Sequence, residues 1–372
     1  MRIIVSGGGT GGHIYPAITL IRAIQEKEPA ADFLYVGTRH GLEADIVQRE
    51  GIPFREVNLL GFKRSLSLAN VGRAAAALAG VVKAMAVVRA FRPDAAIGTG
   101  GYVCGPTLLA ASLLGVPTLI QEQNVVPGIT NRLLAKFVTR VAVGTPEAAA
   151  HFPAEKVIYT GNPIRRAVVD ASRQAAIEAF RLEPTKKTVL VSGGSQGAKT
   201  INRAMIPVIK RCAERDETQI LFVTGRGDYE DTLREIQAAG VDLRAAENIV
   251  VRPYLYDMPE AMAAADLAVF RAGAIGIAEL TARGVPAILV PYPYAAANHQ
   301  EKNARALAAA GAARMILDRE LTGERLLAVL TELLHDDERL KRMGERSRFL
   351  GRPKAAEEIA AIVLGMTEGR KA

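Results

Sequence analysis

The amino-acid sequence predicts an α/β protein built from two tandem Rossmann-like domains. Short apolar runs alternate with longer alanine-rich helical stretches, which is the βαβ rhythm of doubly wound parallel sheets. A strand followed by Val-Ser-Gly-Gly and a helix occurs twice, in residues 2–20 and in residues 188–205. With 372 residues, the chain is long enough for two domains that each bury their own core.

The expected strands are short, and few of them alternate with period two, as is typical of strands covered on both faces. They lie at 3–5, 33–36, 95–97, 118–120 and 141–143, and in the second half at 188–191, 220–223, 249–251, 267–270 and 287–290. Gly161-Asn162-Pro163 breaks the pattern, which predicts domains over 1–163 and 164–350. A last helix at about 354–366 could pack back on the first domain.

Charge and composition narrow the class of partner. The formal net charge of +8 favours an anionic partner, either a phosphorylated substrate or an acidic lipid surface. Nucleic acid is disfavoured because tryptophan is absent, no Lys/Arg block is long and no named nucleic-acid motif occurs. The two cysteines, Cys104 and Cys212, form no disulfide framework, which favours a reducing cytoplasm.

The opening glycine loop has two interpretations. Residues 7–12 satisfy the Gly-x-Gly-x-x-Gly fingerprint of dinucleotide-binding domains. The acid that should end the second strand and hold a ribose is missing, and Arg39 stands there instead. An NADP-dependent oxidoreductase is therefore an open alternative, disfavoured by the missing acid and by the second copy of the loop.

A further glycine loop, residues 98–106, also follows a predicted strand, so three such loops occur in the chain. Glycine lets backbone N–H groups approach a ligand closely, and the helix that follows adds a positive end. Together the loops predict a cleft between the domains that holds a large anionic ligand.

The segment 265–307 predicts a nucleotide-sugar site. A strand ends in Arg271-Ala272-Gly273 and is followed by a helix that carries Glu279. The first turn of this helix can stabilise a diphosphate, and one carboxylate suits the two hydroxyls of a ribose. His299 or Gln300 could hydrogen-bond the sugar. No Asp-x-Asp motif or metal-ligand spacing occurs, so neither a metal nor a cofactor is expected.

The motifs, taken in order, resemble the MurG family of GT-B glycosyltransferases. The resemblance covers nearly the whole chain through residues 8–18, 98–106, 121–137, 161–165, 193–202, 271–280 and 298–304. It implies inverting transfer of N-acetylglucosamine from UDP-N-acetylglucosamine to the 4-hydroxyl of the muramoyl sugar of lipid I, which is a polyprenyl-diphosphate-linked muramoylpentapeptide. The product would be lipid II for peptidoglycan synthesis. Another GT-B-like enzyme, such as a UDP-sugar 2-epimerase or a different UDP-sugar transferase, is the alternative.

The resemblance also implies roles for individual residues. His13 would be the catalytic base, with Glu122 as the second candidate, and Tyr102 and Asn131 would line the acceptor side, where Asn124 also belongs. The donor-binding set would be Thr10, Gly11, Gly12, Asn124, Arg165, Ser195, Leu255, Ala274, Ile275, Gly276, Ile277, Ala278, Glu279 and Gln300. The chain departs from the family where Gln121 replaces a usual histidine, and where Gly276 and Ala278 lack the usual nearby hydroxyl.

Residues 59–93 combine apolar and basic side chains and contain no acid before Asp94. Such a segment suits an anionic membrane surface. The loop around Phe62, Lys63 and Arg64 is the predicted contact, because loops lie at surfaces. The expected location is therefore peripheral, at the cytoplasmic face of the bacterial cell membrane.

Overall fold

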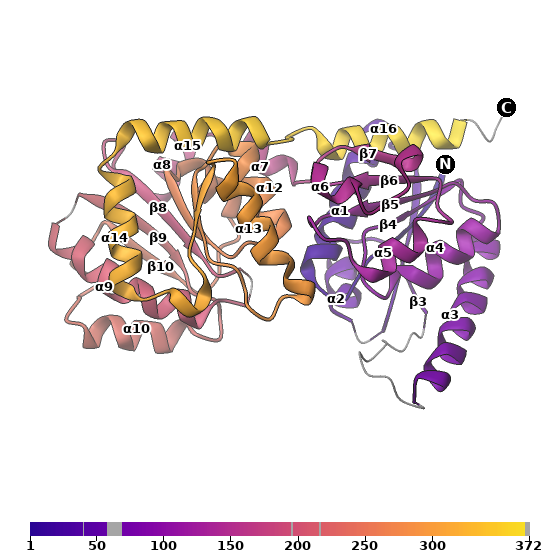
Figure 1. The fold of residues 1–372 in the computed structure, drawn as a ribbon, viewed down its shortest axis with the longest axis horizontal. Coiled ribbons are helices and arrows are strands. Elements are labelled where there is room, and N and C mark those ends of the chain that lie inside the picture. Colours follow the sequence, from indigo (N-terminus) through magenta and orange to yellow (C-terminus); the bar gives the residue numbers. More distant parts are fainter. Residues whose placement is uncertain (40, 58–68, 195, 216, 369–372) are drawn as a thin grey trace. The chain divides into compact units, whose positions relative to one another are not determined.

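The computed structural model describes residues 1–39, 41–57, 69–194, 196–215 and 217–368 (Figure 1). These residues form two compact units. Unit 1 comprises Met1–Ile164 and the C-terminal segment from Lys354 onward, and unit 2 comprises Arg165–Pro353. Each unit contains one fully parallel sheet with helices around it, so the predicted fold class of two Rossmann-like α/β domains is confirmed.

Unit 1 has a seven-stranded sheet in the order β3-β2-β1-β4-β5-β6-β7. Its strands are β1 Arg2–Ser6, β2 Asp32–Gly37, β3 Phe54–Glu56, β4 Ala95–Gly98, β5 Thr118–Glu122, β6 Arg140–Val143 and β7 Val157–Tyr159. Its helices are α1 Gly11–Lys27, α2 Leu42–Arg49, α3 Ala69–Phe91, α4 Cys104–Leu113, α5 Ile129–Leu134, α6 Pro146–Ala149 and α16 Ala355–Glu368, with a 3-10 turn at Ala154–Lys156.

Unit 2 has a six-stranded sheet in the order β10-β9-β8-β11-β12-β13. Its strands are β8 Lys187–Ser192, β9 Thr218–Val223, β10 Ile249–Arg252, β11 Leu267–Phe270, β12 Ala287–Leu289 and β13 Ala313–Met315. Its helices are α7 Arg166–Asp170, α8 Arg173–Phe180, α9 Lys199–Arg215, α10 Tyr229–Ala238, α11 Met258–Ala264, α12 Ala274–Arg283, α13 His299–Ala309, α14 Gly323–Leu334 and α15 Asp337–Leu350, with 3-10 turns at Ala296–Asn298 and Asp318–Glu320.

Each sheet separates two apolar cores, one on each face. In β1, Ile3 and Val5 belong to one buried cluster and Ile4 belongs to the other. In β8, Val189 and Val191 face one cluster while Leu190 faces the second. Strands buried on both faces need apolar side chains at every position, which is why these strands read as continuous apolar runs.

The last helix, α16, belongs to unit 1. Its residues Ala356, Ile359, Ala360 and Val363 are buried in the same cluster as Ile14 and its neighbours on α1. The spacing of these four positions is that of one helix face, so the helix buries one apolar stripe against the unit.

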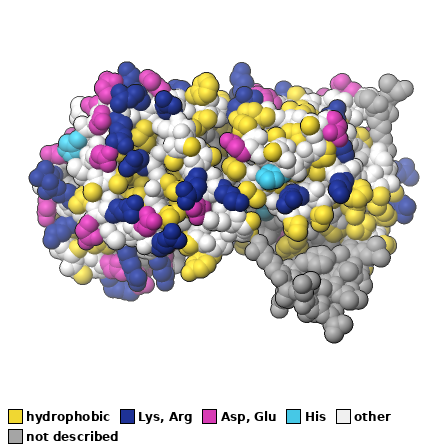
Figure 2. Space-filling model, viewed as in Figure 1, with side chains coloured by type: hydrophobic (Ala, Val, Ile, Leu, Met, Phe, Trp, Pro, Cys, Tyr) yellow, Lys and Arg dark blue, Asp and Glu magenta, His cyan; other side chains and the backbone are white. Residues whose placement is uncertain are grey.

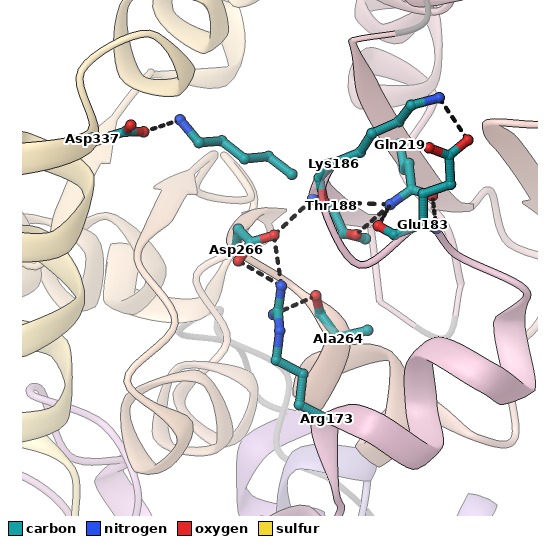
Figure 3. A network of polar contacts seen from close by, with 9 residues as sticks. Arg173, Glu183, Lys186, Thr188, Gln219, Ala264, Asp266 and Asp337 are labelled. Atoms are coloured by element: carbon teal, nitrogen blue, oxygen red, sulfur yellow. Dashed lines mark hydrogen bonds and ion pairs between the residues drawn. The ribbon is translucent and has the colours of Figure 1, made fainter.

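A polar network fixes the amino ends of the central strands of unit 2 (Figure 3). The carboxylate of Asp266 accepts hydrogen bonds from the backbone N–H of Thr188, at 2.8 Å, and from the guanidinium of Arg173, at 3.1 Å. The buried Gln219 side chain donates to the Glu183 carbonyl at 3.0 Å and accepts from the Glu183 N–H at 2.6 Å. These contacts lie at the edge of the sheet opposite the carboxyl ends of the strands.

Candidate active site

Nearly all the described candidate residues follow the carboxyl ends of strands. In both sheets the strand order reverses beside the first strand, between β1 and β4 in unit 1 and between β8 and β11 in unit 2. Ligands of open α/β sheets bind at such switch points, outside the carboxyl ends of the strands. His13 and Tyr102 belong to the loops and helix starts after β1 and β4, and α12 follows β11.

The two glycine loops of unit 1 are in direct contact. The N–H of Gly8 donates to the Gly100 carbonyl at 3.3 Å. Gly101 has a φ of +81°, and a Cβ there would lie 2.3 Å from the Gly8 carbonyl oxygen, so only glycine fits. The loops after β1 and β4 therefore form one backbone surface, as their position at the switch point requires.

Glu43, a residue that the sequence did not single out, holds the opening loop from α2. Its buried carboxylate accepts from the N–H of Gly9 at 3.2 Å and from the N–H and hydroxyl of Thr38 at 3.1 and 2.6 Å. An acid in the first turn of the helix after the second strand could have suggested such a partner for the loop. Its burial, however, could not be predicted from the sequence.

His13 is the third residue of α1 and is half-buried. Its Nδ1 lies 3.0 Å from the Thr99 carbonyl oxygen and 3.0 Å from Oε1 of Gln123. The Thr99 hydroxyl in turn donates to the His13 carbonyl at 2.7 Å. The imidazole is thus fixed by residues that follow β4 and β5, beside the two glycine loops.

Glu122, the second candidate base, is buried at the end of β5. Its Oε1 accepts from the N–H of Asn124 at 3.0 Å, and its Oε2 accepts from the N–H of Gly128 at 3.1 Å and from Nδ2 of Asn131 at 2.9 Å. A carboxylate with this many donors holds the loop between 123 and 128 in place. Asn131 is itself buried.

Other predicted residues of unit 1 lie at its surface. Tyr102 and Thr10 are exposed, and a Cβ on Gly9 would lie 3.7 Å from the Tyr102 ring. Gly11 and Gly12 form the first two positions of α1. The structure therefore brings Thr10, the two glycines, His13 and Tyr102 together around the contact between the loops.

In unit 2 the centre of the predicted donor site is the start of α12. The helix has Gly273 as its N-cap, no side chain caps it, and its first turn carries no acid. Residues Ala274, Ile275 and Gly276 supply the first backbone N–H groups of the helix, and Ile277 and Ala278 follow. A helix start of this kind is suited to an anion because its N–H groups and its dipole point toward the ligand.

Glu279 and Arg165 form an ion pair. The Nε of Arg165, the N-cap residue of α7, lies 2.9 Å from Oε1 of Glu279 on α12. The side chain of Glu279 is 6% exposed and that of Arg165 is 41% exposed. Both residues were predicted as donor ligands, and the structure places them in contact with each other.

Gln300 and Leu255 border the same edge of the unit 2 sheet. Gln300, in the first turn of α13, accepts through Oε1 from the N–H of Tyr292 at 3.0 Å. Leu255, after β10, packs partly buried against the core of unit 2. His299 is half-buried, and its Nδ1 lies 2.7 Å from the Ala296 carbonyl.

Arg271, which ends β11, has a supporting role. Its guanidinium pairs with the carboxylate of Asp318 and donates to the carbonyls of Val290 and Pro291 at 3.2 Å. Asp318 also accepts from the Thr200 hydroxyl at 3.0 Å. Arg271 therefore contacts the loop after β12 directly and is linked to the start of α9 through Asp318.

Some predictions cannot be placed. Ser195, in the glycine loop after β8, and the loop of Phe62, Lys63 and Arg64 lie outside the described residues.

Neither cysteine has the features of a nucleophile. Burial raises the pKa of the Cys104 thiol to about 12 and that of the Cys212 thiol to about 11, so both remain protonated near neutral pH. Within the described ranges, no group of three or more His, Cys, Asp or Glu side chains is arranged to hold a metal ion.

Both units match one family of glycosyltransferases. Residues 3–143 match the glycosyltransferase family 28 N-terminal domain, and residues 188–359 match the family's C-terminal domain. The UDP-N-acetylglucosamine–N-acetylmuramyl-(pentapeptide) pyrophosphoryl-undecaprenol N-acetylglucosamine transferase of Bacillus subtilis strain 168 is 48% identical over 363 residues, which cover 98% of this chain and 99% of that protein. The transferase of the same name from Moorella thermoacetica is 47% identical over 369 residues, covering 99% of this chain and 100% of that protein.

Solved structures give the same result for the fold. The crystal structure of Acinetobacter baumannii MurG superimposes with a TM-score of 0.77 at 29% identity and covers 98% of this chain and 99% of that chain. A UDP-GlcNAc 2-epimerase from Neisseria meningitidis, bound to UDP-GlcNAc, superimposes with a TM-score of 0.69 at 15% identity, covering 98% and 100% of the two chains. At that identity the second likeness shows a shared fold alone.

Proposed function

Because the chain belongs to glycosyltransferase family 28, and within it to the MurG family, we propose that it transfers N-acetylglucosamine from UDP-N-acetylglucosamine to the muramoyl sugar of lipid I. The observation that carries this proposal is the identity of 48% with the Bacillus subtilis transferase over nearly the full length of both chains. The fold is that of MurG, with one parallel-sheet unit for each half of the family's domain pair. The 2-epimerase alternative has only the shared fold in its favour.

Unit 2 is the proposed donor-binding unit. The N–H groups at the start of α12 would bind the diphosphate, and the buried carboxylate of Glu279 would accept the ribose hydroxyls. The ion pair with Arg165 supports this role, because it places a cation next to the expected diphosphate. Gln300 and Leu255 would complete the site at the ends of the neighbouring strands.

Unit 1 would supply the base. The 4-hydroxyl of the muramoyl sugar attacks the anomeric carbon, the bond from that carbon to the diphosphate oxygen breaks, and the hydroxyl proton goes to Nε2 of His13. The configuration at the anomeric carbon inverts, and UDP leaves with the bonding electrons. Of the two candidate bases, His13 fits better, since the Glu122 carboxylate already accepts hydrogen bonds from three residues of its own loop and α5.

The decisive experiment measures UDP release with and without a lipid-linked muramoyl acceptor. A transferase releases UDP only when the acceptor is present, and the acceptor gains one N-acetylglucosamine. Epimerisation of UDP-N-acetylglucosamine without any acceptor would favour the alternative, and turnover with an unrelated acceptor alone would indicate a different transferase.

We also propose that unit 1 contacts an anionic membrane surface, where the polyprenyl tail of the acceptor resides. Among the described residues, no helix has the length and apolarity needed to cross a bilayer. On and just beyond α5, Ile129, Leu133 and Phe137 are exposed at four-residue spacing, with the exposed cations Arg132 and Lys136 between them. Figure 2 shows hydrophobic side chains over this part of the unit with Lys and Arg among them.

This row, Ile129, Leu133 and Phe137, suits shallow insertion while the cations meet lipid headgroups. Replacing all three with serine should reduce cosedimentation with anionic vesicles at low salt. The matched control is Phe349→Ser, which removes the exposed phenylalanine at the end of α15 in unit 2 and should leave binding unchanged. Equal binding by the triple variant and the parent chain would contradict docking through this row and leave the loop at 62–64 as the predicted contact.

A further inference from the structure

Three buried side-chain amides extend from His13 into unit 1. They belong to Gln123, directly after β5, to Gln121 within β5, and to Asn162 after β7. Gln123 lies next to the imidazole, Gln121 next to Gln123, and Asn162 next to Gln121. None of the three can gain or lose a proton near neutral pH, so the direction of their hydrogen bonds is fixed by their orientation alone.

Backbone carbonyls determine the orientation of Gln123. Its Nε2 lies 2.6 Å from the Thr99 carbonyl oxygen and 3.2 Å from the Gln121 carbonyl oxygen. Carbonyl oxygens only accept, so the NH₂ group must face them, and the opposite flip would set oxygen against oxygen. It follows that Oε1 of Gln123 is the atom that faces Nδ1 of His13 at 3.0 Å.

The next two amides are anchored in the same way. Nε2 of Gln121 donates to the Glu122 carbonyl at 3.3 Å and to Oδ1 of Asn162 at 2.9 Å, so its Oε1 is left to accept from Gln123 at 2.5 Å. Nδ2 of Asn162 donates to the Gln123 carbonyl at 3.0 Å. In each hydrogen bond between two of these side chains, the amide nearer to His13 therefore donates and the next one accepts.

At Nδ1 the imidazole meets two acceptors. Nδ1 of His13 faces the Thr99 carbonyl and Oε1 of Gln123, both at 3.0 Å. From this geometry we infer that Gln123, held by Gln121 and Asn162, is a positioning residue that keeps the proton of neutral His13 on Nδ1. The ring lone pair then lies on Nε2, which is the atom that must accept the proton of the attacking hydroxyl.

This inference rests on the proposed function for its catalytic meaning, and it adds to it the residues that select the reactive tautomer. A histidine base oriented by a second group is a recurrent arrangement, in which a carboxylate commonly accepts from Nδ1. Here the side-chain oxygen of Gln123, an uncharged amide, takes that place. Gln121, which stands where the family usually has a histidine, is compatible with this arrangement. Its amide oxygen accepts from Gln123, and its NH₂ group donates to Asn162.

The test reads the tautomer directly. Long-range ¹H–¹⁵N correlation spectra of the full chain, labelled with ¹⁵N and recorded without substrate, distinguish the two neutral forms of each of its five histidines. The signals of His13 are identified by their loss in His13→Gln. The expected result is protonation of Nδ1 in the parent chain, and a ring protonated on Nε2 would overturn the inference whether or not the chain is a transferase.

Variants then separate positioning from stability. Gln123→Met should shift the tautomer ratio and lower kcat about tenfold with the KM for UDP-N-acetylglucosamine within twofold, because one neutral hydrogen bond to the ring is lost. Gln121→Met should act in the same direction by about threefold, and it carries the test if Gln123→Met does not fold. At pH 8 Gln121→His should behave like the parent chain, since a neutral imidazole can accept from Gln123 and donate to Asn162.

The matched control is Gln219→Met in unit 2. Gln219 is also a buried strand glutamine with hydrogen bonds from both ends of its amide (Figure 3). Its replacement should lower the melting temperature while the His13 signals and kcat stay unchanged. A loss of kcat in Gln219→Met equal to that in Gln123→Met, or an unchanged tautomer in Gln123→Met, would show that Gln123 has only a structural role.

Discussion

The two strand–glycine loop–helix segments share one sequence pattern, but different groups hold them. After β1, the N–H of Gly9 donates at 3.2 Å to the carboxylate of Glu43, which comes from α2. After β8, the N–H of Gly194 donates at 3.2 Å to the hydroxyl of Ser192, which belongs to the strand itself. There, a Cβ on Gly197 would lie 2.2 Å from the Thr224 carbonyl, so close backbone packing shapes the second loop.

The difference teaches why the dinucleotide fingerprint at residues 7–12 is misleading. A pyrophosphate needs free N–H groups and a positive environment at the glycine loop. Glu43 places a carboxylate against this loop and uses the N–H of Gly9, which disfavours an anion at that point. The oxidoreductase interpretation thus loses its phosphate site. In unit 2 the start of α12 carries no acid in its first turn, and no side chain caps it.

The largest expected effect tests whether unit 1 carries the chemistry. His13→Ala should lower kcat by roughly 10²–10⁴, the usual contribution of a general base, while the Kd of UDP-N-acetylglucosamine stays unchanged in calorimetry. The matched control is His151→Ala, an exposed histidine of the same unit, which should retain full activity. Near-normal turnover in His13→Ala would move the role to Glu122 or to no single residue.

A smaller effect is expected from a change in unit 2, and it should appear in the affinity for the donor. Glu279→Ala should weaken the Kd of UDP-N-acetylglucosamine by roughly 10–150-fold, because a charged hydrogen bond contributes about 1.5–3 kcal/mol. Isothermal calorimetry measures this directly, with the exposed Glu324→Ala as a control that leaves Kd unchanged. An unaltered Kd in Glu279→Ala would remove this residue from the donor site and leave it as the partner of Arg165.

Removing the Glu43 carboxylate that holds the opening glycine loop should have an effect of intermediate size, on the melting temperature. Glu43→Gln replaces one acceptor oxygen with a donor facing the N–H groups of Gly9 and Thr38. Losing a charged hydrogen bond of about 1.5–3 kcal/mol should lower the Tm of unit 1 by roughly 4–10 °C. Glu50→Gln, in the exposed pair with Arg22, should change Tm by less than about 2 °C. Equal shifts in the two variants would contradict the role assigned to Glu43.

The smallest expected effect concerns metal. We predict that EDTA leaves kcat unchanged, because the leaving diphosphate would be stabilised by the start of α12 and by Arg165. Enzyme treated with EDTA and desalted is compared with enzyme given magnesium or manganese. Activity that EDTA abolishes and either cation restores would overturn the prediction.

The sequence by itself determined the central strands, because a strand buried on both faces must be apolar throughout. All ten predicted strands form at the expected places. The edge strands β3, β7 and β13 were missed because each has only three residues and borders one neighbour, so its composition is mixed: Phe-Arg-Glu, Val-Ile-Tyr and Ala-Arg-Met. The motifs also placed His13 and Glu279 correctly after the first and fourth strands of their sheets.

Only the tertiary structure decided which groups meet at those positions. Glu43 reaches Gly9 across 34 residues of chain, Gln123 reaches His13 across 110, and Arg165 reaches Glu279 across 114. A local pattern records the period of burial and the glycines of a tight turn, since these depend on neighbours in sequence. A hydrogen bond between distant side chains depends on how the strands are ordered in the sheet and on which residues become buried there, and no local pattern records either property.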